Sequence, residues 1–265
     1  LAISGCSELS RWTIHLRVFS ATWSADMSLI YTLTLRQLAG KWRIIIIVVL
    51  AILPIMLSIS SRFGDVRPIP SEIDDILVNG MFASAILPII VLALATAALG
   101  NEVEDKTLSF LVLNPLARWR IVLPKLLAAI TIGGLVVVVS GVVSALVAFE
   151  GDTEAAIAIG IALFAGVAAY SSLFLWLGLM TSRGLAIGLL YVFLWEGLFS
   201  NFVSGIRMVS IREYIIGVTS AIDDGRFAGP NQDPVASATA IIGVIAVTIV
   251  FLLLSVRRLQ RMDVP

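Results

Sequence analysis

The chain has 265 residues, of which 59% are hydrophobic and 14% are charged, and its formal net charge is zero. Soluble domains usually carry about 25% charged residues, so this chain is too apolar for water to solvate its whole surface. A neutral chain without a long basic tract lacks the charge pattern of a nucleic-acid-binding protein. One cysteine and one histidine exclude an internal disulfide and leave no paired ligands for a metal, so we predict neither a metal site nor catalytic residues.

Residues 1–26 precede the first coherent apolar pattern, which begins at Met27. Because poorly tied termini are often not part of the folded unit, we interpret residues 1–26 as an extension that is disordered or artefactual. We place the folded domain at residues 27–265.

Six apolar runs are long enough to cross a bilayer core, which takes about 20 residues of helix. Backbone groups in lipid must hydrogen-bond internally, and these runs do not alternate as barrel strands do, so we expect helices. The runs are 44–60 and, approximately, 77–99, 123–149, 155–180, 185–203 and 235–256. The sequence therefore predicts an all-α membrane protein with six transmembrane helices, of which Pro54 and Pro88 kink the first two.

The loops between these runs differ in their content of Lys and Arg, which sets orientation in a membrane. Eleven lie on the side of both chain ends, against five on the other side. The eleven are Arg36, Lys41, Arg43, Lys106, Arg118, Arg120, Lys125, Arg183, Arg257, Arg258 and Arg261, and the five are Arg62, Arg67, Arg207, Arg212 and Arg226. We therefore expect both termini in the cytoplasm.

Two segments outside the apolar runs have the spacing of an amphipathic helix. Before the first span, the apolar face consists of Tyr31, Leu35, Leu38 and Trp42. Trp and Tyr favour the membrane interface, so we predict an amino-terminal interface helix on the cytoplasmic surface. After the fifth span, the face consists of Ile211, Ile215, Val218 and Ile222, with Arg212, Glu213, Ser220 and Asp223 facing away. This second segment is either a helix at the outer interface or an ordinary packed loop.

The loop after the second span carries much of the charge of the chain. Asn101 with Glu104 three residues later has the pattern of a helix amino-terminal cap, and Leu108, Leu111 and Val112 form a small apolar face. Asn114-Pro115 ends the pattern. An anchor at the membrane would need only the basic residues, so we interpret this segment as a short cytoplasmic helix that docks a partner.

The same loop resembles that of the permeases of ABC type-2 exporters. The ordered residues are Glu102, Glu104, Thr107, Leu108, Phe110, Leu111, Pro115, Arg118 and Lys125. The segments "LTLRQLAGKWR" at 33–43, "YVFLWEGLF" at 191–199 and "VSIREY" at 209–214 are also similar to that family. Lys106 departs from the pattern, because the family prefers glycine there.

The resemblance implies a six-span permease that pairs with a second permease copy, identical or different, and docks two separate ATPase subunits, which bind ATP and Mg. The loop between spans two and three would then be a coupling helix. The residues that would contact the ATPase are Glu102, Glu104, Thr107, Leu108, Leu111, Pro115 and Arg118. A GxxxxGK[ST] phosphate loop is absent from the sequence, as this division of labour implies. The expected location is the cell membrane, specifically the inner membrane of a prokaryote.

Glu196 is the one acidic residue deep within a predicted span. A carboxylate at this depth costs about 2.5–3.5 kcal/mol, so it is usually paired or functional. It either lines the translocation path or holds span five against its neighbour. Gly184 and Gly188 in the same span form a small-residue motif that typically packs within one subunit.

Two other functions compete with the exporter permease. A secondary transporter or channel usually needs several ionisable groups at the midplane or an internal repeat, and neither is present. An intramembrane enzyme would need a pattern such as HExxH or a Ser/His pair within the spans, and the only histidine, His15, precedes them. We therefore expect a transport subunit that is not itself an enzyme.

Overall fold

The computed structural model describes residues 27–63, 75–104, 117–181, 183–199, 210–223 and 237–261. Within these ranges the chain is helical, with turns between helices and no strand, so the all-α class is confirmed. Residues 1–26 lie outside the described ranges, and the boundary predicted at Met27 stays a prediction.

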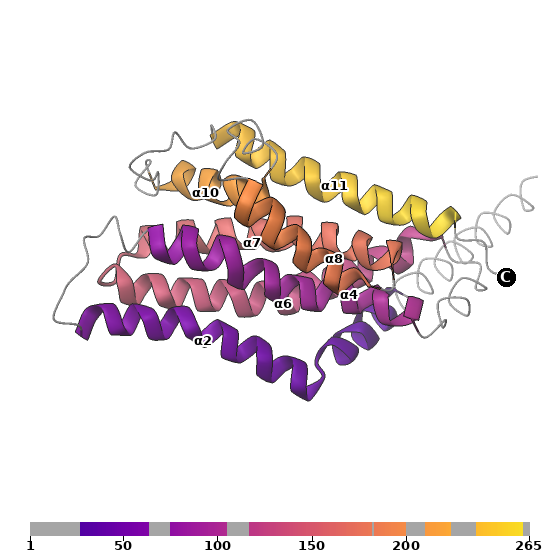
Figure 1. Cartoon of the computed structure of the whole chain (residues 1–265), viewed down its shortest axis with the longest axis horizontal. Coiled ribbons are helices and arrows are strands. Elements are labelled where there is room, and N and C mark those ends of the chain that lie inside the picture. The colour runs from indigo at the N-terminus through magenta and orange to yellow at the C-terminus, as the bar shows by residue number, and fades with distance from the viewer. Residues whose placement is uncertain are drawn as a thin grey trace, which may run out of the picture.

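The helices form one elongated bundle (Figure 1). A first helix covers residues 27–38. The labelled helices are α2 (Lys41–Phe63), α4 (Leu87–Glu104), α6 (Trp119–Ala148), α7 (Thr153–Met180), α8 (Gly184–Leu190), α10 (Ile211–Ile222) and α11 (Ser237–Arg261). Two π-helices adjoin these α-helices: η1 (Asp75–Ile86) directly precedes α4, and η2 (Tyr191–Phe199) directly follows α8.

Five helical segments are long and apolar enough to cross a membrane. They are Lys41–Arg62, Ile76–Gly100, Trp119–Ala148, Thr153–Met180 and Ser237–Arg261, which correspond to predicted spans one, two, three, four and six. The predicted fifth span corresponds to α8 and η2, whose apolar helix, Gly184–Gly197, is shorter than these. The chain is therefore a multi-pass membrane protein, and a count of six spans stays a prediction.

Helix α7 lies at the centre of the bundle and packs against α4, α6, α10 and α11. In its most apolar stretch 72% of the residues are buried, against 22% in α2 and 17% in α11, so these last two lie at the periphery. Small residues let the neighbours of α7 come close. A Cβ on Gly178 would lie 3.1 Å from the carbonyl oxygen of Thr96 in α4, and one on Gly166 would lie 2.5 Å from the Ile215 side chain in α10.

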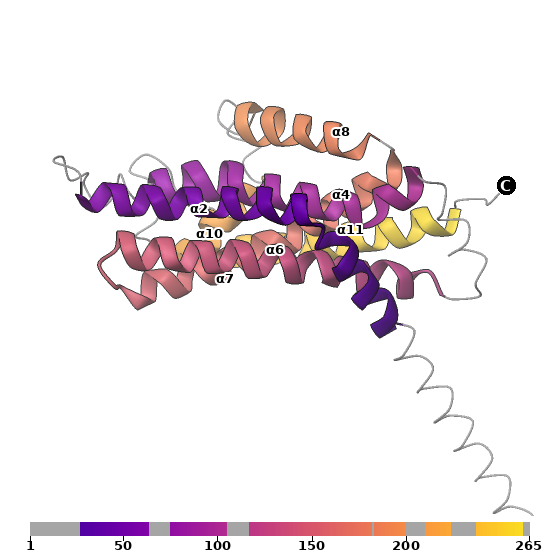
Figure 2. The same ribbon diagram turned by 90° about the horizontal axis from the view of Figure 1, so that it is seen from below.

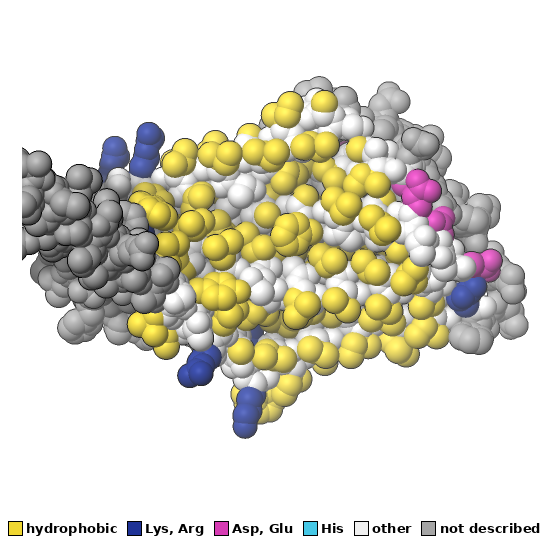
Figure 3. Space-filling view, turned by 180° about the vertical axis from the view of Figure 1, so that it is seen from behind, with side chains coloured by type: hydrophobic (Ala, Val, Ile, Leu, Met, Phe, Trp, Pro, Cys, Tyr) yellow, Lys and Arg dark blue, Asp and Glu magenta, His cyan; other side chains and the backbone are white. Residues whose placement is uncertain are grey.

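An apolar band covers the middle of the surface, with most of the Lys and Arg side chains at one end and the acidic side chains gathered at the other (Figure 3). The band includes Val48, Ile52, Ile157, Ile161 and Ile245, each at least 42% exposed. Large exposed aliphatic side chains along whole helices suit a lipid environment. We name the end with residues 27–43, 117–125, 181, 183–184 and 257–261 the basic end, and its assignment to the cytoplasm remains a prediction.

The amino-terminal helix is only partly as the sequence predicts. Leu38 is fully buried, and Tyr31 and Leu35 pack against the core, so this part of the face is confirmed. Trp42 is 80% exposed and belongs to α2, so it does not share a helical face with the other three residues, which is a correction. The helix of residues 27–38 ends before Gly40 and α2 starts anew at Lys41, so the helical spacing does not carry over to Trp42. Figure 2 shows the two helices meeting at an angle.

Helix α10 confirms the spacing of Ile211, Ile215 and Val218, which are at most 5% exposed. It packs against α7, α11 and η1 rather than lying on a free surface. The prediction that Glu213 and Ser220 face away is wrong, because they are 6% and 8% exposed. Other helices cover α10 on several sides, so residues outside the predicted apolar face are buried as well.

Gly184 and Gly188 pack within the chain. A Cβ on Gly184 would lie 3.0 Å from the Cα of Gly178 in α7, and one on Gly188 would overlap the side chain of Leu92 in α4. This agrees with the prediction that the motif packs inside one subunit. Pro88 lies in the first turn of α4, where the preceding π-helix ends, and Pro54 lies within α2.

We expect Gly178→Ala to destabilise the bundle, because its new methyl group would press on the backbone of Thr96 and force α4 away from α7. The matched control is Gly100→Ala at the same contact, where the Cβ would lie 3.9 Å from the carbonyl oxygen of Gly178. Overpacking costs about 1–3 kcal/mol, and each 1 kcal/mol lowers Tm by about 2–4 °C in a chain of this size. Thermal unfolding in detergent measures the difference, and equal Tm values for the two variants would contradict the close approach.

Candidate functional site

The predicted ATPase-contact residues lie around the end of α4 and the start of α6. Glu102 is partly buried in the last turn of α4, Glu104 is the last residue of that helix, and Arg118 is the residue before α6. Four others lie outside the described residues: Thr107, Leu108, Leu111 and Pro115. The structure therefore does not test the predicted coupling helix as a whole.

The predicted start of that helix is wrong at Asn101. Helix α4 continues through Asn101 to Glu104, so Asn101 does not cap a new helix. Glu102 therefore lies near a helix carboxyl end, where the macrodipole disfavours an acidic side chain. A cation brought by another helix compensates for this.

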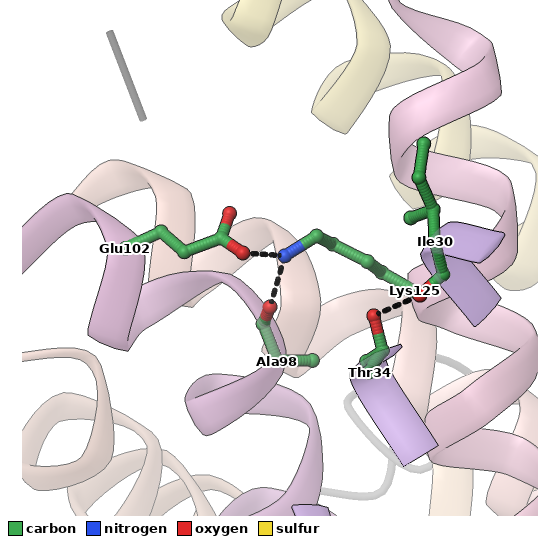
Figure 4. A network of polar contacts seen from close by, with 5 residues as sticks. All are labelled: Ile30, Thr34, Ala98, Glu102 and Lys125. Atoms are coloured by element: carbon green, nitrogen blue, oxygen red, sulfur yellow. Dashed lines mark hydrogen bonds and ion pairs between the residues drawn. The ribbon is translucent and has the colours of Figure 1, made fainter. Parts of the chain in front are cut away.

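Lys125 of α6 is that cation (Figure 4). Its side chain is 2% exposed, and its ammonium forms an ion pair with Glu102 Oε1 and donates a hydrogen bond of 2.8 Å to the carbonyl oxygen of Ala98. A lysine is rarely buried unless it is paired. The ammonium thereby joins the end of α4 to the beginning of α6, on the two sides of the loop at 105–116.

The sequence places Lys125 among the basic residues of the cytoplasmic side and in the family pattern, but it does not indicate the pairing with Glu102. The available indication was a lysine in the apolar run "VLPKLL" at 122–127, where a charge needs a partner. The choice among the acidic residues of the preceding loop required the structure.

Glu196 of η2 is the centre of a second polar cluster. The residue is 0% exposed, and its carboxylate accepts hydrogen bonds from the Tyr191 hydroxyl at 3.1 Å, the Ile211 backbone N–H at 3.2 Å and the Ser210 hydroxyl. Ser210 is the amino-terminal cap of α10, and its hydroxyl oxygen also accepts from the Glu213 N–H. The carboxylate thus lies at the positive end of the α10 dipole, which favours a negative charge.

Arg212 extends this cluster to a third element. Its Nε donates to Asn79 Oδ1 of η1 at 2.8 Å, and its Nη1 lies 3.5 Å from the carbonyl oxygen of Glu196. Hydrogen bonds therefore connect η1, η2 and α10. The sequence marks Glu196 as exceptional, but its periodicity predicts that Arg212 faces away, and nothing in it indicates Asn79, which is 133 positions earlier.

A groove of about 620 Å³ lies near the basic end. It is bounded by the end of the helix of residues 27–38, the beginning of α2, the stretch of α4 from Ile89 to Gly100, the end of α7 and the start of α8. Its walls are mainly apolar, and polar side chains lie among them. The apolar residues include Ile47, Leu50, Ile90, Ala93 and Ala97, and the polar ones are Gln37, Lys41, Arg43, Thr96 and Thr181. In the described part of the chain, no three His, Cys, Asp or Glu residues are grouped so that they could hold a metal.

We expect Glu196→Ala to lower stability markedly, because it leaves the buried Ser210 hydroxyl and Ile211 N–H without their acceptor. An unsatisfied buried donor costs about 1–3 kcal/mol. Glu196→Gln keeps one acceptor oxygen and should lose less, and Glu154→Ala, at an exposed acidic residue, is the control. Thermal unfolding and monodispersity in detergent measure this. A Glu196→Ala variant as stable as the parent but inactive in transport would instead favour a role in the translocation path.

Comparison with known proteins agrees with this arrangement of apolar helices. A family model described as "ABC-2 family transporter protein" matches residues 17–264, nearly the whole chain. The match begins ten residues before Met27, inside the segment that we interpret as an extension. A search of curated proteins found no match. The extent of the family match, together with the membrane-spanning helices, shows that the chain is a permease of the ABC-2 transporter family.

Proposed function

We propose that the chain is the membrane-spanning subunit of an ATP-driven exporter, working with a second permease copy and with two copies of a separate ATPase. Family membership supports the transport role. The observation that carries the coupling part of the proposal is the Lys125–Glu102 pair, which joins two membrane-spanning helices at the predicted docking loop. The proposed setting is the inner membrane of a prokaryote.

The pair makes the ends of α4 and α6 respond together to force on the loop. Separating Lys125 from Glu102 would leave a buried charge without compensation, which costs about 3–5 kcal/mol. When the ATPase displaces the loop, moving α4 and α6 together therefore costs less free energy than separating them at the ion pair. Helix α4 then acts on α7 through the close contact at Gly178.

The partner ATPase would bind ATP and Mg and supply the hydrolysis step. The role of this chain is to dock the ATPase through residues 102–118, to transmit its motion to the bundle, and to form the path together with the second permease copy. Apolar side chains of α8 and η2 support a membrane-embedded contact with that copy, since Leu189, Leu190 and Phe193 are 37%, 57% and 61% exposed. Figure 2 shows α8 on the outside of the bundle.

A secondary transporter has less support. Such a protein needs an ionisable group that can exchange an ion or proton near the midplane. Glu196 is fully buried and its carboxylate accepts three hydrogen bonds from within the chain, which suits its proposed role in holding η2 against α10.

The docking proposal predicts that the chain copurifies with an ATPase that carries a phosphate loop. Leu108→Asp with Leu111→Asp should abolish this association, because two charges replace the predicted apolar contact face. The control is Ser237→Asp, an exposed position at the end opposite the basic end. Purification from the native host in mild detergent, followed by mass spectrometry, tests this. A stable chain with no such partner would reject the exporter assignment.

The coupling pair predicts a specific double-mutant result. Lys125→Met alone should destabilise the chain more than Lys125→Met with Glu102→Met, because the single change leaves a mostly buried carboxylate unpaired. Glu102 also lies in the proposed docking region, so hydrolysis is compared with the ATPase at saturating concentration. Under that condition the double variant should lose permease-dependent ATP hydrolysis, since α4 and α6 are no longer joined. Thermal unfolding and ATPase assays on the purified complex measure the two effects. Unchanged hydrolysis in the double variant would contradict the proposed role of the pair.

A further inference from the structure

The groove at the basic end has the form of a binding site for an amphiphile. Its volume of about 620 Å³ falls within the range of about 300–1,000 Å³ that small-molecule sites occupy. Five helices contribute to it: that of residues 27–38, α2, α4, α7 and α8. Three of them contribute glycines, Gly100, Gly178 and Gly184, so part of the wall consists of backbone without side chains. The apolar wall consists of side chains such as Leu50, Ile90 and Ala93, which suit an acyl chain.

The polar part of the groove is cationic. Lys41 and Arg43 line it, and none of the described aspartates or glutamates does. Within the part of the chain that the structure describes, neither cation forms an ion pair or a side-chain hydrogen bond. Trp42 lies between them and is 80% exposed, as expected of an aromatic side chain at the level of lipid headgroups. Two unpaired cations beside an apolar groove complement a ligand with an anionic head and an apolar tail.

We propose that this groove binds one anionic phospholipid from the leaflet at the basic end, with an acyl chain against Leu50, Ile90 and Ala93 and the headgroup at Lys41 and Arg43. Basic pockets between membrane helices bind anionic headgroups in this way. A second copy of the chain fits the groove less well. A two-fold contact centred there would bring the same two cations of each copy together. The proposal requires only that the chain lies in a membrane and is independent of the ATPase partner.

Native mass spectrometry of the full-length, delipidated chain tests the headgroup contact. The added lipids are phosphatidylglycerol, which is anionic, and phosphatidylcholine, which has no net charge. The parent should bind one phosphatidylglycerol in preference to phosphatidylcholine. Lys41→Gln with Arg43→Gln should weaken the binding of phosphatidylglycerol by about 30-fold and leave phosphatidylcholine binding unchanged. The matched control, Arg257→Gln with Arg261→Gln, removes two exposed charges from the same end outside the groove.

Trp42 reports whether a lipid chain lies in the groove. Phosphatidylglycerol with a brominated acyl chain should quench the fluorescence of Trp42, measured as the difference between the parent and Trp42→Phe. Ala93→Phe, which fills the groove, should abolish this quenching and weaken both lipids. Both groove variants should remain monodisperse, because Lys41 is exposed and Arg43 and Ala93 are partly exposed.

Three results would overturn the proposal. An equal loss of phosphatidylglycerol binding in the Arg257/Arg261 control would show only general attraction to the basic end. Unchanged lipid affinity in Ala93→Phe would show that no acyl chain enters the groove. A dimer that binds no lipid and is disrupted by Ala93→Phe would assign the groove to a second copy. None of these results depends on whether an ATPase binds.

Discussion

A polar group buried among apolar helices must find its partner within the protein, and this constraint organises the bundle. Lys125 illustrates it at the basic end, where burial of the ammonium requires both the carboxylate of Glu102 and the carbonyl oxygen of Ala98. Glu196 illustrates it within η2, where the carboxylate is bound by Tyr191, Ser210 and the backbone of Ile211. In each case the penalty for an unpaired group specifies which helices must be neighbours.

The two polar connections have complementary positions in the bundle. The Lys125–Glu102 pair joins α4 to α6 beside the predicted docking loop, whereas the Glu196 cluster joins η2 to α10 and, through Arg212 and Asn79, to η1. Helix α7 lies between these regions and contacts α4, α6 and α10 with small residues at the closest points. A movement of α4 or α6 at the basic end therefore also displaces α7, because these helices are in close contact.

The periphery of the bundle serves a different purpose. Helices α2 and α11 leave most of their apolar residues exposed on the outside of the bundle, and α8 with η2 adds a further exposed apolar face. Where α2 begins, the surface is hollowed between five helices and carries Lys41 and Arg43 beside apolar walls. The chain thus combines a core, in which each buried polar group needs a partner within the protein, with an outer surface that can contact lipid or another subunit.

The sequence alone determined the membrane class, the all-α architecture and five of the spans, because a long apolar helix satisfies its own backbone and can be identified without knowledge of any contact. It also identified Glu196 as exceptional and the helical spacing at Ile211, Ile215 and Val218. Only the tertiary structure decided that Lys125 pairs with Glu102, that Arg212 reaches Asn79, that Glu213 is buried and that Trp42 is exposed. These outcomes depend on which helices become neighbours, and residues 23 or 133 positions apart carry no local pattern that specifies it.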